Sequence, residues 1–123
     1  MTDAEVKNAK IESARLGFGN EHGFLDHSLT LDYGGSGQAW GGYVLGFQAG
    51  WPGNSLAGDT IIAILNTVGV SDWGDLCGKP IRALSSWSNV YGIGHYLKDK
   101  WVWIDGEGAL RTGTLEELKE ATP

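Results

Sequence analysis

Cysteine is nearly absent from this chain, with a single residue, Cys77, among 123. One cysteine excludes an intramolecular disulfide and a cysteine-rich metal site, and it favours an intracellular, reducing setting. Long apolar runs are absent too, and none approaches the roughly 20 residues that a membrane-spanning helix requires. The N-terminal segment MTDAEVKNAK is polar and lacks the apolar core of a secretory signal. We therefore expect a soluble, cytoplasmic protein without a membrane partner.

Positively charged residues are also few. Nine lysines and arginines stand against fifteen aspartates and glutamates, which gives a net charge of −6. Proteins that bind DNA or RNA polymers are generally basic, so this balance argues against a nucleic-acid partner. A small anionic ligand is still compatible with the sequence, because it needs only a local positive pocket.

Charge of either sign is missing from two long stretches. Residues 34–58 contain no charged side chain, and the only ionisable groups in residues 83–97 are His95 and two tyrosines. Two interpretations stay open: a core hairpin rich in glycine and tryptophan, or a subunit interface or ligand pocket. Four of the six tryptophans lie in or beside these stretches: Trp40, Trp51, Trp87 and Trp101.

Glycine is abundant by contrast, and it is concentrated in a predicted hairpin. Residues 25–33 alternate strictly, so that Leu25, His27, Leu29, Leu31 and Tyr33 should share one face of a strand. A second alternating run, 38–47, should place its odd-numbered residues on one face: Ala39, Gly41, Tyr43, Leu45 and Phe47. The tip between the runs is Gly34-Gly35-Ser36-Gly37. So many glycines are expected where a backbone or a ligand approaches closely.

The remaining pattern predicts one domain, 1–123, of the α+β class. The spacing of Ile61, Ile64, Leu65 and Val68 predicts one main helix over about 56–68. Thr114 and Glu117 form a capping box that starts a short C-terminal helix. With one main helix on a largely antiparallel sheet, one face or edge should stay free for a second copy. We expect strands at 7–18, 80–85, 90–97 and 101–104, a turn at 17–23, a loop at 49–55 and a helical turn at 71–76.

No motif for catalysis or metal binding is apparent. Asp26 and His27 are adjacent on a strand and point to opposite faces, and His22 and His95 lack the spacing of zinc sites. The tip lacks the lysine and following helix of a phosphate-binding Walker loop, although its N–H groups could hold an anion. Cys77 is interpreted as a small apolar filler. We expect no enzymatic activity, no cofactor and no metal.

The segment Ser85-Ser86-Trp87-Ser88-Asn89 is the better pocket candidate. It joins two predicted strands and offers hydroxyls, an amide and an indole, which can hydrogen-bond to and stack on a nucleobase. Arg82, Lys98 and Lys100 are near in sequence and could meet phosphates. An ordinary polar turn with one exposed tryptophan is the alternative.

Three segments resemble a known family: LDYGGSGQAWGGYVLGF (31–47), TVGVSDWGDLCGKPIRA (67–83) and GIGHYLKDKWVWI (92–104). They resemble the first-described phage anti-Thoeris proteins. The resemblance implies a non-enzymatic sponge that sequesters cyclic ADP-ribose isomers in the bacterial host cytoplasm. It also implies dimers that assemble into hexamers, and for some members a second pocket type for cyclic di- or trinucleotides.

The matching segments indicate two ligand regions. One is the 34–38 loop, and the other is the Trp87 and Asn89 region with a C-terminal arginine, for which only Arg111 is available. Two other functions stay open: an acidic inhibitor that binds a protein of bacterial immunity, like anti-CRISPR proteins, and a nucleotide hydrolase. The hydrolase would need a nucleophile or metal. The candidate ligand-binding residues are Gly35, Ser36, Gly37, Gln38, Arg82, Trp87, Asn89, Lys100 and Arg111.

Overall fold

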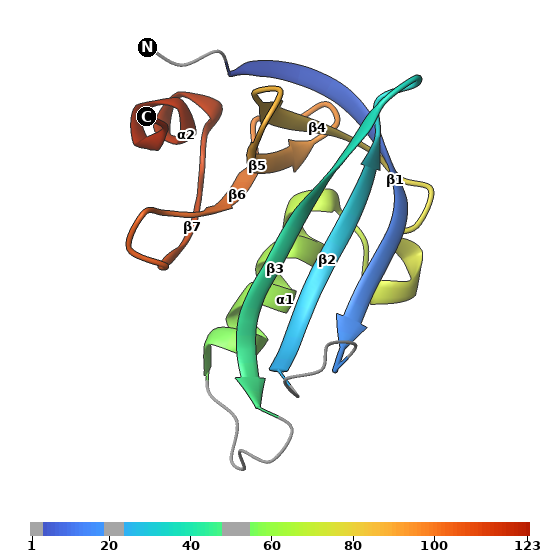
Figure 1. Ribbon diagram of the computed structural model, residues 1–123, viewed down its shortest axis with the longest axis vertical. Coiled ribbons are helices and arrows are strands. Elements are labelled where there is room, and N and C mark those ends of the chain that lie inside the picture. The colour runs from blue at the N-terminus through green and yellow to red at the C-terminus, as the bar shows by residue number, and fades with distance from the viewer. Residues whose placement is uncertain (1–3, 19–23, 48–54) are drawn as a thin grey trace.

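The chain folds around one antiparallel sheet of seven strands in the order β3-β2-β1-β4-β5-β6-β7, accompanied by helices (Figure 1). The computed structural model describes residues 4–18, 24–47 and 55–123. This arrangement confirms the expected α+β class. The elements are β1 (Glu5–Gly17), β2 (Phe24–Asp32), β3 (Gly37–Phe47), α1 (Ser55–Val68), the 3₁₀ turn η1 (Trp73–Asp75), β4 (Pro80–Ser85), β5 (Val90–His95), β6 (Trp101–Ile104), β7 (Leu110–Gly113) and α2 (Leu115–Ala121).

The ends of the helices follow the local chemistry of the sequence. Gly69, with φ of +90°, ends α1, and its N–H donates to the Leu65 carbonyl at 2.8 Å. At α2 the hydroxyl of Thr114 accepts the Glu117 N–H, and the Glu117 carboxylate accepts the Thr114 N–H. Helix α1 therefore begins and ends within one residue of its expected limits, and α2 begins where its capping box was expected to start it. Neither is long and apolar enough to cross a membrane, and the same holds for every helix in the described ranges.

Two strand predictions need correction, and both concern the C-terminal half. The strand expected over 90–97 ends at His95, because the N–H groups of Leu97 and Lys98 turn back to the His95 Nδ1. Strand β7 was not expected, since four residues with one large apolar side chain carry little periodic signal. Its place is set by pairing with β6.

The helices cover different faces of the sheet. Ile64 and Val68 of α1 pack on the buried residues of the central strands, including Ile11, Leu29 and Ile81. Helix α2 covers the opposite face at the β4–β6 end, where its one buried residue, Leu118, packs on the groups of that face. The second face is therefore partly covered, which the sequence did not indicate (Figure 1). The partners of Leu118 are Leu84, Trp101 and Trp103.

The predicted facing of β3 is wrong. Trp40 and Leu45 are buried, at 2% and 1% exposure, while Ala39 is exposed. Gly41 and Gly42 adopt positive φ values, of +115° and +80°, and the register against β2 shifts at this point. This bulge changes which residues of β3 face the core.

Cys77 is also not the apolar filler that was expected, because it is exposed and its thiol donates to the Glu12 carbonyl.

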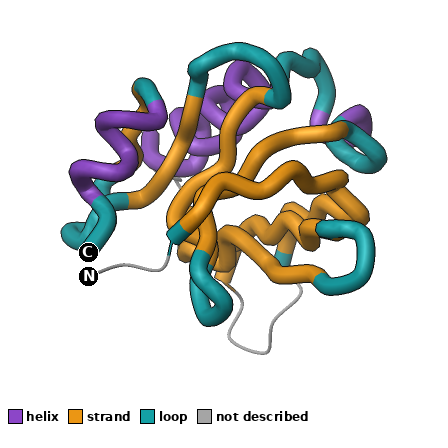
Figure 2. Tube along the Cα trace, turned by 90° about the horizontal axis from the view of Figure 1, so that it is seen from above, coloured by secondary structure: helices purple, strands orange, loops and turns teal. Residues whose placement is uncertain are grey.

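The sheet curves so that β3 approaches β5, although β2, β1 and β4 separate them in the strand order. Figure 2 shows the strands crossing one another steeply in this twisted layer. The start of β3, at Gln38, thereby reaches the turn between β4 and β5. The predicted turn at 17–23 and loop at 49–55 lie mostly outside the described residues.

Candidate ligand-binding cleft

The turn between β4 and β5 presents Trp87 to solvent. The Ser86 N–H donates to the Asn89 carbonyl at 2.8 Å, and the Asn89 N–H donates to the Ser86 hydroxyl at 3.2 Å. These bonds close the turn on itself and leave the indole 86% exposed. Tryptophan is usually largely buried, so an indole held outward on a closed turn is unusual.

Gln38 ties this turn to the start of β3. Its Nε2 donates to the carbonyls of Ser86 and Trp87, at 2.9 and 3.2 Å. Its Oε1 accepts the Tyr33 hydroxyl at 2.7 Å. Both donor hydrogens of the side-chain amide are therefore taken by the turn, which Gln38 positions, while its oxygen keeps one further lone pair.

A cleft of about 390 Å³ lies between the start of β3 and this turn. Small-molecule sites commonly have volumes of about 300–1,000 Å³, so the cleft is large enough for a nucleotide fragment. Hydrogen-bonding groups come from the turn, and the wall behind them is the start of β3. The lining residues are Gln38, Ala39, Trp40, Gly41, Trp87, Ser88, Asn89 and Val90.

Lys7 and Tyr33 stand behind Gln38, and sequence reasoning missed both. The Lys7 ammonium lies 5.1 Å from the centre of the Tyr33 ring, and 3.7 Å from the Glu5 carboxylate. Burial raises the pKa of Tyr33. The phenol therefore stays protonated at neutral pH and donates to Gln38. A lysine at an inward-facing position of β1 was the signal available in the sequence.

The glycine-rich tip does not line the cleft. Gly35 has no positive φ and has open space where a Cβ would stand, so no neighbouring protein atom requires glycine there. Gly37 does meet that need, because a Cβ would lie 2.6 Å from the Leu31 carbonyl oxygen. Ser36 is exposed, and its carbonyl accepts the Tyr33 N–H at 2.9 Å. Of the 34–38 loop, only Gln38 lines the cleft.

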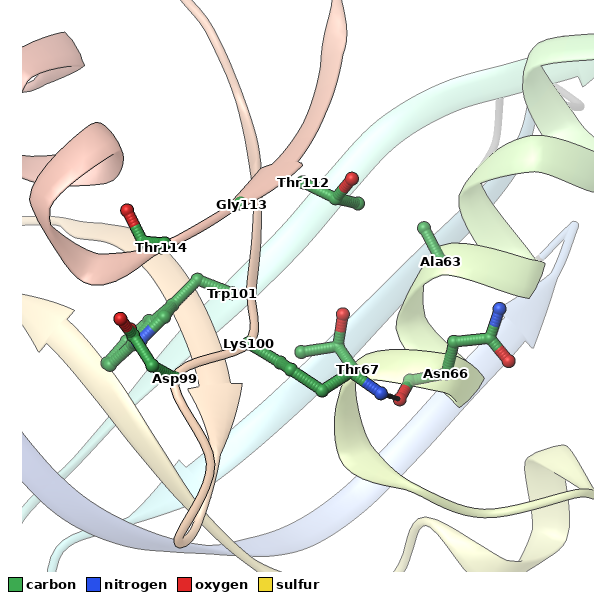
Figure 3. A pocket seen from close by; sticks show the side chains of 9 residues that line it. All are labelled: Ala63, Asn66, Thr67, Asp99, Lys100, Trp101, Thr112, Gly113 and Thr114. Carbon is green, nitrogen blue, oxygen red and sulfur yellow. Dashed lines mark hydrogen bonds between the residues drawn. The ribbon is translucent and has the colours of Figure 1, made fainter.

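Three of the cations considered for the ligand, Arg82, Lys100 and Arg111, lie outside the cleft. Arg82 donates to the carbonyls of His95 and Lys98, at 2.9 and 2.8 Å, and so holds the β5–β6 turn. Arg111 pairs with Asp105 at 2.9 Å, beside the β6–β7 turn. Lys100 lines a different cavity, where its ammonium donates to the Asn66 carbonyl (Figure 3). The structure thus joins Gln38, Trp87 and Asn89 but leaves these three cations outside their cleft.

The described histidines are structural. Burial lowers the pKa of His27 to about 4, so its ring is neutral between β2 and β3. His95 accepts two backbone N–H groups at Nδ1, and its pKa is lowered by desolvation and then by Lys98, Lys100 and Arg82. No cluster of three or more His, Cys, Asp or Glu suited to a metal occurs within 4–18, 24–47 and 55–123. His22 lies outside the described residues.

Comparisons of the chain with protein-family models, curated proteins and solved structures found no match. The chemistry of the cleft follows from its own residues. Those residues supply one free aromatic face, a set of hydrogen-bonding groups and a braced backbone. Such a site can bind a planar, polar ligand.

Proposed function

We propose that this protein binds and sequesters a cyclic nucleotide without cleaving it, as the resemblance to phage anti-Thoeris proteins implies. The observation that carries the proposal is the Trp87 indole, 86% exposed on a braced turn at the edge of a polar cleft. A nucleobase stacked on such an indole gains roughly 1–3 kcal/mol. Because Gln38 holds the turn, little order would have to be created on binding.

Asn89 and Ser88 give the base polar partners. An amide and a hydroxyl each donate and accept hydrogen bonds, which suits the edge of a purine or pyrimidine. Lys7 adds a positive charge behind Gln38, where its ammonium lies over the Tyr33 ring. Sequestration requires affinity alone, and stacking and hydrogen-bonding groups supply it.

We further propose that the protein is a homo-oligomer in the bacterial host cytoplasm, a dimer or a hexamer. The charge-free stretch 34–58 supports this assembly, because surfaces depleted of charge are typical of interface cores. The cyclic ADP-ribose isomers are the first ligands to test, followed by cyclic di- and trinucleotides.

A depletion assay tests the function. The full-length protein is incubated with each cyclic nucleotide, the free ligand is measured after filtration, and the bound fraction is released by heat and chromatographed. We expect depletion of at least one ligand and its recovery intact. A new product peak would establish the hydrolase instead. If no candidate is depleted, the proposed sequestration of a nucleotide is wrong, and inhibition by binding to a protein becomes the preferred function.

Trp87→Ala is the decisive variant. Loss of one stacked aromatic should weaken binding about tenfold or more. Leu97→Ala is the matched control, because Leu97 is also highly exposed, at 81%, but lies on the turn at the other end of β5. Titration calorimetry should show weakened binding for the first variant alone. Equal affinities for the two variants would place the ligand elsewhere.

The acidic inhibitor is the second candidate, and the β5–β6 turn favours it. Tyr96 and Leu97 are exposed there on a turn that Arg82 and His95 hold in shape. Tyrosine is enriched at protein-binding hot spots, so Tyr96 on a rigid turn suits a contact with a protein partner. Under this alternative, Leu97→Ala abolishes function in infected cells and Trp87→Ala does not.

A further inference from the structure

A second cavity, of about 490 Å³, lies between the second half of α1 and the β6–β7 hairpin (Figure 3). It shares no lining residue with the Trp87 cleft. Figure 3 shows Ala63 and Thr67 of α1 facing Thr112 of β7 across the opening. The β5–β6 turn and the residue before α2 complete the wall. The lining residues are Ala63, Asn66, Thr67, Asp99, Lys100, Trp101, Thr112, Gly113 and Thr114.

The two charged groups of this cavity are each held by a helix end. Lys100 donates to the Asn66 carbonyl at 2.9 Å, near the C-terminal end of α1, where the helix dipole is negative. Asp99 accepts the Leu115 N–H at 2.8 Å, at the first residue of α2. The lining carries one positive and one negative charge, so an anion finds no excess of positive charge here.

The remaining polar groups of the cavity are neutral. Thr67, Thr112 and the Asn66 side chain bear hydroxyl or amide groups, each of which can both donate and accept a hydrogen bond. Thr114 also lines the wall, but its hydroxyl is engaged with Glu117 in the capping box. The available groups therefore match a ligand whose own groups both donate and accept.

Trp101 adds a further observation. The residue is 1% exposed and lines the cavity, and its indole Nε1 makes no hydrogen bond within the described part of the chain. A buried donor without a partner costs about 1–3 kcal/mol, so such groups in folded proteins usually have a water or ligand acceptor. The ring itself packs with Leu84, Trp103 and Leu118 on the α2 face of the sheet, so this donor does not decide which ligand the cavity takes.

We propose that this cavity binds a neutral sugar, a pentose or hexose ring with adjacent hydroxyl groups. A sugar hydroxyl donates and accepts, as threonine and asparagine do, and its ring carries no charge to be balanced. Inorganic phosphate is disfavoured, since Lys100 is engaged with α1 and Asp99 would repel it. This site is separate from the proposed nucleotide cleft and does not depend on it.

The test is a titration of ¹⁵N-labelled full-length protein, followed by amide chemical shifts. The probes are D-ribose, D-glucose, maltose and inorganic phosphate. We expect saturable shifts at residues of this cavity with at least one sugar and none with phosphate. Thr112→Val and Asn66→Ala should each weaken that binding by about tenfold, while Asn66→Ala keeps the backbone carbonyl that Lys100 needs.

Thr30→Val is the matched control, because Thr30 lies on β2 outside the cavity. It should leave sugar binding unchanged, and so should Trp87→Ala, which separates this proposal from the proposed function. Absence of saturable shifts with all three sugars would overturn the proposal. So would shifts with phosphate alone, or sugar shifts confined to the Trp87 cleft.

Discussion

At the scale of single residues, Gln38 explains how the fold keeps Trp87 exposed. Its amide bonds two carbonyls of the 86–89 turn and one phenol, so the turn is fixed from the side of β3. The backbone that carries the tryptophan is therefore ordered before any ligand binds. Gln38 lines the cleft, as a ligand-contacting residue would, and its bonds to the turn also make it a positioning residue.

Gly94 should tolerate no side chain. An added Cβ would lie 2.6 Å from Cε2 and 2.7 Å from Cε3 of Trp101, a ring that is fully buried. We expect Gly94→Ala to lower the free energy of unfolding by about 1–3 kcal/mol, measured by urea denaturation. Gly35→Ala is the control, since open space and ordinary backbone angles should make it neutral or stabilising by up to about 1 kcal/mol. Equal stability of the two variants would contradict the packing of Trp101 on Gly94.

His27 should make stability depend on pH. Burial lowers its folded-state pKa from 6.5 to about 4, with Asp26 opposing and Arg15 adding to the shift. Stability from the neutral ring is complete above pH 6.5 and declines as pH falls toward 4, because the unfolded chain takes up the proton first. The loss should approach about 3 kcal/mol.

Urea denaturation between pH 7.5 and pH 4.5 measures this loss, and His27→Gln should flatten the dependence. His95→Gln is the control, because the pKa of His95 is also lowered. This variant should keep most of the dependence of stability on pH. The ring protons of His27 give an independent check by NMR. Titration of those protons near pH 6.5 would show that the ring is not buried in its neutral form.

At the scale of elements, α2 depends on its first turn. With only seven residues it has little intrinsic stability, so the capping box and the burial of Leu118 decide whether it forms. Thr114→Ala should lower the free energy of unfolding by about 1 kcal/mol. Thr114→Ser keeps the hydroxyl and should retain most of that stability. Thermal unfolding of both variants is the measurement, and a serine variant as unstable as the alanine variant would exclude the cap as the cause.

At the scale of the whole molecule, the assembly is the main prediction. One chain has a mass of 13.2 kDa, and light scattering after size exclusion should give a multiple of this value, two or six. The reason is that residues 34–58 carry no charged side chain, and depletion of charge is typical of interface cores. A mass near that of one chain at micromolar concentration would refute the prediction. Measurements at low and high salt should agree, because an uncharged interface is weakly screened.

The cleft was only partly predictable. Trp87 and Asn89 were identified from composition, as an indole and an amide in a short segment between two strands, and they line the cleft. Lys7 and Tyr33 were missed because nothing local connects them to that segment. Arg82, Lys100 and Arg111 were nominated for their charge, but each is engaged with protein groups outside the cleft.

The sequence by itself determined the class of fold, the β2–β3 hairpin, α1 and the cap of α2. Each of these depends on periodicity or on groups a few residues apart, which sequence records directly. The tertiary structure alone decided that Trp40 rather than Ala39 enters the core, because a bulge at Gly41 and Gly42 shifts the facing of β3. It also decided that Gln38 meets the carbonyl of Ser86, 48 residues away. Such contacts follow from the curvature of the whole sheet, which no local pattern encodes.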